Sequence, residues 1–138
     1  MTRGLSVVLT VTDEDTVIYA DGRRTFRIID NLLNNAFKYS MPNTRIYVEL
    51  TKNEGKIALL IKNISESQLN IDAKELMERF KRGDESRTTE GSGLGLSIAD
   101  SLATMQDGKL ILEIDGDLFK VRLIFNEYNG EMEIEYEM

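Results

Sequence analysis

The feature that most restricts the fold of this sequence is the segment from Asp21 to Ser40, which carries apolar side chains at spacings of three and four residues. That spacing is the period of an α-helix with one apolar face. Asp21 is a suitable N-cap, and Pro42 would end the helix. Such a helix must lie against another layer, which the rest of the chain has to supply. The apolar residues are Phe26, Ile28, Ile29, Leu32, Leu33, Ala36 and Phe37.

Runs rich in β-branched and apolar residues predict that layer as a β-sheet. One run precedes the helix, and Val17 to Ala20 is expected to continue it as extended chain. Four runs follow in two pairs, and Asn53 with Gly55 and Gly116 with Asp117 supply the hairpin turns. We expect one domain over residues 1–138, an α/β two-layer sandwich whose mixed, mostly antiparallel sheet is covered on one face by helices. The runs are LSVVLTV (5–11), TRIYVEL (44–50), KIALLIKN (56–63), KLILEID (109–115) and LFKVRLIF (118–125).

Two shorter helices are predicted between the two hairpins. Asp72 and Glu75 have the spacing of a capping box, and the helix that they start would run through Phe80. The second helix would end at Gly108. Between them, residues 83–93 hold no large apolar side chain, so we expect a mobile loop there. The final EMEIEYEM alternates acidic and apolar residues, as in a strand with an acidic outer face. The apolar positions of the second helix are Leu94, Ile98, Leu102 and Met105.

The composition excludes several classes of function. The chain has no cysteine and no histidine, so it can form neither a disulfide nor a thiolate zinc site, and histidine cannot act as its general base. A net charge of −7 disfavours nucleic acid and anionic membranes as partners. No apolar run could span a bilayer, and the N-terminus lacks the apolar core of a signal peptide. An anionic ligand would need a local positive patch, for which the candidates are Lys38, Arg79, Lys81, Arg82 and Arg87.

A glycine-rich stretch, GSGLGLS at residues 91–97, leads into the predicted helix that ends at Gly108. Its G-x-G-x-G spacing differs from the dinucleotide fingerprint, and no G-K-S/T of a P-loop follows. Backbone N–H groups at a helix N-terminus can bind an anion. The alternative is a flexible loop followed by a closely packed helix.

A polar face on the long helix is the second candidate site. Asn31, Asn35 and Lys38 fall at i, i+4 and i+7, so they share one face, which we place opposite the apolar one. Three asparagines within five residues disfavour a helix, and such local conflicts often mark functional sites. Amide oxygens and a lysine suit a magnesium-bound polyphosphate. The alternative is an ordinary solvated surface.

Three motifs together resemble the catalytic, ATP-binding domain of bacterial sensor histidine kinases, which has the Bergerat-type ATP-binding fold. NLLNNAFKYS (31–40) is similar to the asparagine box of that family, ERFKRGD (78–84) to its phenylalanine box, and GSGLGLSIA (91–99) to its second glycine box. The three stand in the order found in the family, and the resemblance covers about residues 5 to 125.

The resemblance implies ATP and Mg²⁺ as cofactors. It makes Asn35 the magnesium ligand, with Asn31 supporting the metal and the phosphates. Lys38 would meet phosphate oxygens, and Tyr39 would flank the nucleotide. It also implies a mobile ATP lid over about residues 81–93.

Within that lid region, the resemblance implies that Phe80 anchors the lid and that Arg82 provides it with charge. The glycines would let the lid fold over ATP and let the backbone at the helix start contact the phosphates. The residues of this stretch that would bind the nucleotide are Gly91, Ser92, Gly93, Leu94, Gly95 and Leu96.

The sequence departs from the family at the first glycine box. The family offers an aspartate there, followed by asparagine and glycine, and the aspartate binds the adenine amino group. This chain has IKNISES, so that Asn63 stands at the aspartate position and Ile64 and Ser65 follow it. An asparagine oxygen can still accept a hydrogen bond from adenine, but without the charge. The alternative is that Asn63 is only a turn residue at the end of a strand.

The resemblance further implies a protein histidine kinase, which transfers the ATP γ-phosphoryl group to a histidine for relay to a response regulator. Related ATPases of this fold have a glutamate that activates water where this chain has Asn31. An amide cannot be a general base, so rapid ATP hydrolysis is not expected.

The acceptor histidine has to lie elsewhere, because this chain has no histidine. We expect it on a separate dimerisation domain of the same full-length protein, with the sensor domain also absent from this chain. The chain alone would hold no catalytic residue and would not autophosphorylate. It would be the cytoplasmic part of a membrane-bound sensor kinase, without direct membrane or nucleic-acid contact. The alternatives are a serine kinase of the anti-sigma-factor type and a degenerate regulatory module that no longer binds ATP.

Overall fold

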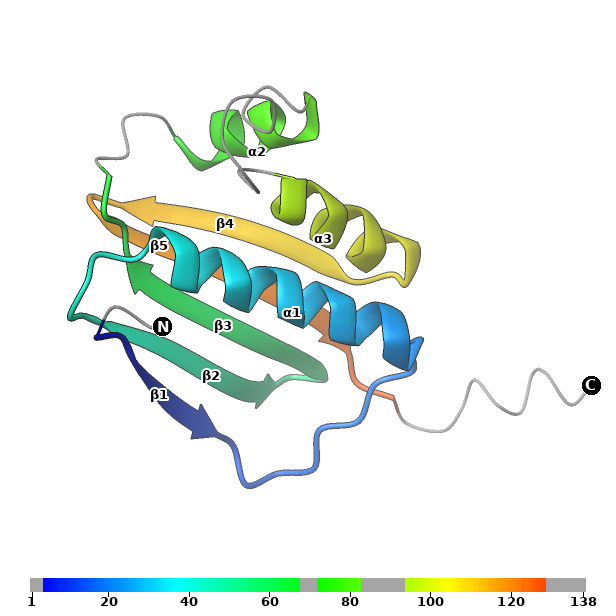
Figure 1. Ribbon diagram of the computed structural model, residues 1–138. Helices are drawn as coiled ribbons and strands as arrows, with labels where there is room; N and C mark the ends of the chain where they lie inside the picture. The colour runs from blue at the N-terminus through cyan, green and yellow to red at the C-terminus, as the bar shows by residue number, and fades with distance from the viewer. Residues whose placement is uncertain (1–3, 68–71, 83–93, 129–138) are drawn as a thin grey trace, which may run out of the picture.

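A computed structural model of the chain describes residues 4–67, 72–82 and 94–128. Its five strands form one sheet in the order β1-β2-β3-β5-β4 (Figure 1). The β1–β2 pair is parallel, and the β2–β3, β3–β5 and β4–β5 pairs are antiparallel, which confirms a mixed, mostly antiparallel sheet. The strands are β1 (Ser6–Val11), β2 (Arg45–Asn53), β3 (Lys56–Ile64), β4 (Lys109–Asp115) and β5 (Leu118–Asn126).

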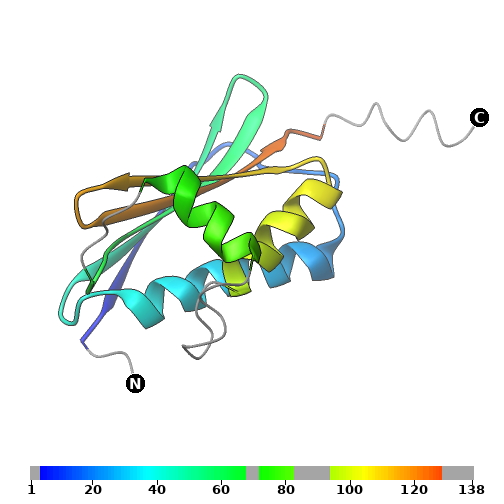
Figure 2. The ribbon, with the colours of Figure 1, turned by 90° about the horizontal axis from the view of Figure 1, so that it is seen from above.

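Three helices, α1 (Gly22–Tyr39), α2 (Ala73–Arg82) and α3 (Leu94–Met105), lie together on one face of this sheet (Figure 2). The two-layer sandwich is therefore confirmed. α1 and α3 lie side by side, and α2 lies beside α3 (Figure 1). The core between the layers includes Ile28 and Leu32 of α1, Leu96 of α3, and Ile46 and Ile61 of the sheet. Within the described residues, no helix is both long and apolar enough to cross a membrane.

The apolar face of α1 is narrower than the sequence predicts. Its fully buried ridge is Ile28, Leu32 and Ala36, whereas Phe26 is 70% exposed. One helix lying on a sheet buries only the residues that point directly at the layer below, and residues a quarter turn away stay at the flank. The prediction that Phe26 lies on a buried face is therefore wrong. Residues 17–20 also lie outside β1 and form irregular chain.

The shorter helices and both hairpins match their predictions closely. The N–H of Glu75 donates to the Asp72 carboxylate over 2.8 Å, as a capping residue requires. Gly108 ends the turn after α3, where its N–H donates to the Ala103 carbonyl. The predicted strand at 131–138 and the predicted loop at 83–93 lie outside the described residues.

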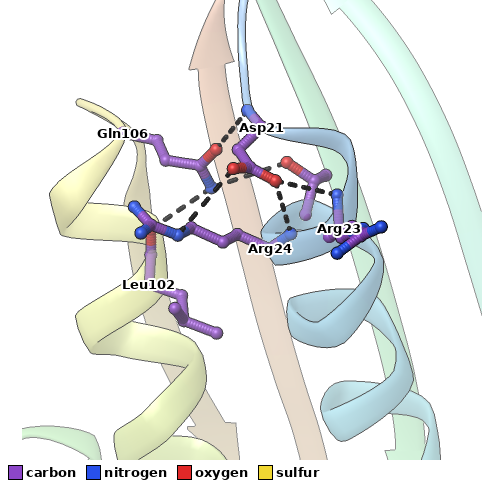
Figure 3. Close-up of polar contacts among 6 residues, drawn as sticks. Asp21, Arg23, Arg24, Leu102 and Gln106 are labelled. Atoms are coloured by element: carbon purple, nitrogen blue, oxygen red, sulfur yellow. Dashed lines mark hydrogen bonds and ion pairs between the residues drawn. The ribbon is translucent and has the colours of Figure 1, made fainter.

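A hydrogen-bonded cluster joins the start of α1 to the end of α3 (Figure 3). The carboxylate of Asp21 accepts from the N–H groups of Arg23 and Arg24 at 2.9 and 3.1 Å, which confirms Asp21 as the N-cap. The N–H of Asp21 donates to the side-chain oxygen of Gln106 at 2.6 Å. The amide nitrogen of Gln106 donates to the Leu102 carbonyl at 3.3 Å. These hydrogen bonds fix the N-terminal end of α1 against the C-terminal end of α3.

The charge of Asp21 should make the stability of the fold depend on pH. The N–H of Arg24, with that of Arg23 and the two guanidinium charges, holds the pKa of Asp21 below its ordinary value of 3.8. A lowered pKa means that the unfolded chain takes up the proton first, so the contribution is complete above the ordinary pKa and is lost as pH falls through the folded one. Asp21→Asn keeps an N-cap and removes this titration. Urea unfolding at about pH 6 and about pH 3 should show a smaller loss in the variant than in the wild type. An equal loss of stability in the wild type and the variant would show that the charge of Asp21 adds nothing to its effect as an N-cap.

Candidate functional site

The C-terminal end of α1 is tied to the end of β3 by backbone hydrogen bonds. The N–H of Met41 donates to the Ile64 carbonyl at 2.8 Å, and the N–H of Glu66 donates to the Tyr39 carbonyl at 2.9 Å. Ser40 and Ser65 form an antiparallel bridge between the two segments. The asparagine-rich helix and the strand that carries Asn63 therefore meet at one end of the molecule.

Ser40 is the side chain at the centre of this junction, and it is fully buried. Its hydroxyl and its backbone N–H both donate to the Ala36 carbonyl, at 2.5 and 3.1 Å. Ser65 is buried as well, and its hydroxyl donates to the Ser67 carbonyl at 2.7 Å. Two buried hydroxyl residues thus lie where the helix end pairs with the strand end.

Asn63 lies on the helix-covered face of β3. Side chains alternate along a strand, so Asn63 shares this face with the buried Ile57 and Ile61. It is only 3% exposed, and its backbone pairs with Phe119 of β5. Among the described residues, no hydrogen bond to its carboxamide is found. A buried amide without a protein partner normally costs stability.

The asparagines of α1 lie at the edge of the buried face, and not opposite it as we expect from the sequence. The side chains of Asn31 and Asn35 are half-buried, whereas Lys38 is exposed. The Nδ2 atom of Asn31 is buried and has no hydrogen-bond partner among the described residues. The neighbouring Asn34 differs, because it is exposed and donates to Asp30. The solvated-surface alternative therefore fits Asn34 but not Asn31.

The structure describes only part of residues 91–96, whose backbone is predicted to bind phosphate. Leu94 and Gly95 begin α3, and Leu96 is buried in the core. α3 begins beside the middle of α1 (Figures 1 and 2). Phe80 and Arg82 lie in the last turn of α2. Gly91, Ser92 and Gly93 lie outside the described residues.

The junction thus places the last turn of α1, with Tyr39, beside the strand end that carries Asn63. Asn31 and Asn35 lie earlier on the same helix, which packs beside α3. Tyr39 is half-buried at this junction. The described part of the chain holds no cluster of three histidine, cysteine or carboxylate side chains that could bind a metal alone. A cation here would need amide oxygens and ligands brought by an anionic partner.

The family profile described as "Histidine kinase-, DNA gyrase B-, and HSP90-like ATPase" matches residues 20–130. The chain belongs to this family of ATPases. The resemblance stated from the sequence motifs is therefore confirmed.

Sensor kinases are among the similar proteins. The probable sensor protein PcoS of Escherichia coli is 38% identical over 122 residues, which is 85% of this chain and 26% of PcoS. The sensor histidine kinase RppB of Synechocystis is 31% identical over 77% of this chain and 25% of its own length. The chain thus spans about a quarter of these relatives.

Solved structures agree on the fold. The mycobacterial sensor histidine kinase MprB superposes with a TM-score of 0.69 at 25% identity, over 91% of this chain and 84% of the other. The nucleotide-free catalytic domain of the histidine kinase ThkA gives 0.76 at 21% identity, over 91% of this chain and 80% of the other. This chain therefore has the fold of a histidine kinase catalytic domain.

Ser40→Ala should weaken the junction between α1 and β3. It removes the hydroxyl that donates to the Ala36 carbonyl, and a buried hydrogen bond contributes about 1 kcal/mol. Urea unfolding should show a loss of that size. Ser101→Ala is the control, because Ser101 is exposed on α3 and its loss should leave stability nearly unchanged. Equal effects of the two substitutions would contradict a special role for Ser40.

Proposed function

We propose that this chain binds Mg²⁺-ATP at the asparagine site and acts as the catalytic domain of a sensor histidine kinase. The observation that carries the proposal is the buried, unpartnered Nδ2 of Asn31 on the helix flank that also carries Asn35 and Lys38. A folded protein rarely keeps such an atom unless a ligand or water satisfies it. The family match and the relatives named as sensor kinases support the same assignment.

The residues present fit a magnesium-bound triphosphate. Asn35 would ligate the metal through its amide oxygen, with Asn31 beside it, and Lys38 would neutralise phosphate charge. Tyr39 and Asn63 would hold the purine base at the α1–β3 junction. The backbone at the start of α3 and the glycines at 91–95 would bind phosphates, and Phe80 and Arg82 would serve the lid over about residues 81–93. When bound, Mg²⁺ would neutralise the charge that develops on the transferred phosphoryl group.

The side chains of this site favour transfer to an external group over hydrolysis. Asn31 has an amide, which cannot take a proton from water. Positioning and charge neutralisation supply most of the catalysis of phosphoryl transfer, so the site needs no base of its own for an acceptor brought from outside. The half-buried flank of α1 would orient the triphosphate while the buried junction excludes water from the base.

The acceptor is proposed to be a histidine on a dimerisation domain of the same full-length protein, because this chain has no histidine. A response regulator would then receive the phosphoryl group, in the cytoplasm. The relatives are about four times as long as the matched region, which leaves room for such domains. A single domain spanning residues 1–138 stays a prediction.

Asn35→Ala should abolish magnesium-dependent ATP binding, because it removes the proposed metal ligand. Calorimetric titration of the wild type should give micromolar to sub-millimolar affinity for ATP with Mg²⁺ and much weaker binding with EDTA. The exposed Asn34→Ala is the matched control and should bind like the wild type. A folded wild-type chain that binds no nucleotide would overturn the proposal in favour of a regulatory module.

The kinase step has its own test. The chain is mixed with radiolabelled ATP and a separately purified histidine-bearing dimerisation domain from the full-length protein. We expect an acid-labile label on that domain and none on this chain alone. An acid-stable label on a serine would instead support the serine-kinase alternative.

Asn31→Leu should raise the stability of the ligand-free chain and weaken ATP binding. Leucine has the same branched arrangement of heavy side-chain atoms, and it removes a buried unsatisfied amide that costs about 1–3 kcal/mol. Urea unfolding and ATP titration on the same preparations measure the two effects. Asn34→Leu, at an exposed position, should do neither. A destabilised Asn31→Leu variant would show that the amide is satisfied in the free protein.

A further inference from the structure

The buried carboxamide of Asn63 bears on which bases the site accepts, and this inference rests on the proposed nucleotide-binding function. Asn63 is 3% exposed, faces the helices, and has no hydrogen bond to its carboxamide among the described residues. A carboxamide carries one acceptor oxygen and two N–H donors, whereas a carboxylate carries acceptors alone. The residue at this position therefore decides which hydrogen-bonding edge a purine can present.

The two purine types differ at that edge. A 6-aminopurine such as adenine presents an N–H donor at position 6 and an acceptor at N1. A 6-oxopurine such as guanine or hypoxanthine presents an acceptor at position 6 and a donor at N1. A carboxylate held opposite position 6 accepts from the amino group of the first type. With the second type it could accept from N1–H, but the oxygen at position 6 would then face another acceptor and stay unpaired. A carboxamide can satisfy both types, because rotation by half a turn exchanges its oxygen and its nitrogen.

The surroundings of Asn63 would allow that rotation without any movement of the backbone. The strand is fixed on both sides of it, since Asn63 pairs with Phe119 and the N–H of Ser65 donates to the Asp117 carbonyl at 2.8 Å. The carbonyl of Ile64 is held by Met41. Since no described side chain binds the carboxamide in one orientation, its rotation breaks no hydrogen bond. The backbone of Asn63 is therefore held in place, while its carboxamide can adopt either orientation.

We propose that Asn63 lets this site accept 6-oxopurine nucleoside triphosphates as well as ATP. The carboxamide oxygen accepts from the amino group of adenine and its nitrogen donates to N1. With a 6-oxopurine the amide is reversed, so that its nitrogen donates to the oxygen at position 6 and its oxygen accepts from N1–H. Asn63 is then the residue that sets base specificity, and the substrate class is purine nucleoside triphosphates.

Inosine triphosphate is the probe, because it has the 6-oxo edge but lacks the 2-amino group of guanine. The wild-type chain is titrated with Mg²⁺-ATP and Mg²⁺-ITP by calorimetry. The two dissociation constants should lie within about tenfold of each other, which is about 1.4 kcal/mol. ATP binding together with ITP binding that is about a hundredfold weaker or worse would overturn the inference and leave the proposed function intact. If neither nucleotide binds, the proposed function fails and the inference fails with it.

Asn63→Asp tests whether the carboxamide is responsible. The variant should keep ATP and lose ITP by about a hundredfold or more, since a buried polar site strongly rejects a ligand whose hydrogen bonds do not match. Asn34→Asp is the matched control, because it adds the same charge on an exposed face of α1 and should keep the wild-type ratio. An unchanged ratio in a folded Asn63→Asp variant would overturn the assignment. If that variant does not fold, the wild-type ratio alone decides.

Discussion

The burial of one narrow ridge of α1 on the sheet is the contact on which the rest of the molecule depends. Ile28, Leu32 and Ala36 are almost fully buried there, and the larger of these side chains each contribute about 1.5–3 kcal/mol by leaving water. The ridge fixes the rotation of the helix about its axis. Asn31 and Asn35 follow buried residues by three positions, so the same rotation sets them at the edge of the core. A rotation that buried Phe26 would turn the asparagines away from that edge.

The buried amides of the site lower the stability of the fold, and other interactions have to offset this loss. The Nδ2 atom of Asn31 loses its contact with water, and no described residue replaces that contact. Asn63 is 3% exposed, and no described residue bonds to its carboxamide. Core packing and the hydrogen bonds of Ser40 and Asp21 offset that loss. The same atoms explain why affinity can be gained on binding, because a ligand that pairs with them removes a cost already present in the free protein.

The sequence predicts the layers well and the contacts between them poorly. The five strands and three helices of the described residues follow from local patterns, since periodicity is set by neighbours along the chain. Phe26 is wrongly predicted as buried because the apolar spacing shows which side of α1 faces the sheet. It does not show how much of that side the sheet covers. The pairing of Ser40 with Ser65 and of Asp21 with Gln106 has no local signal, because those partners meet only in the folded chain. Asn31, Asn35 and Asn63 could be selected from their residue type and position, but their burial could not.

The order of the strands in the sheet has a consequence for the time at which the site forms. β5 lies between β3 and β4, so the strand that carries Asn63 has its second neighbour only when residues 118–126 arrive. A ribosome releases the three asparagines long before that segment. Until then β3 is an unprotected edge, and such edges invite wrong pairing with other chains. The contacts between β3 and β5 join residues that are distant in sequence, so loop closure slows their formation. The chain therefore becomes able to bind a ligand only near the end of folding.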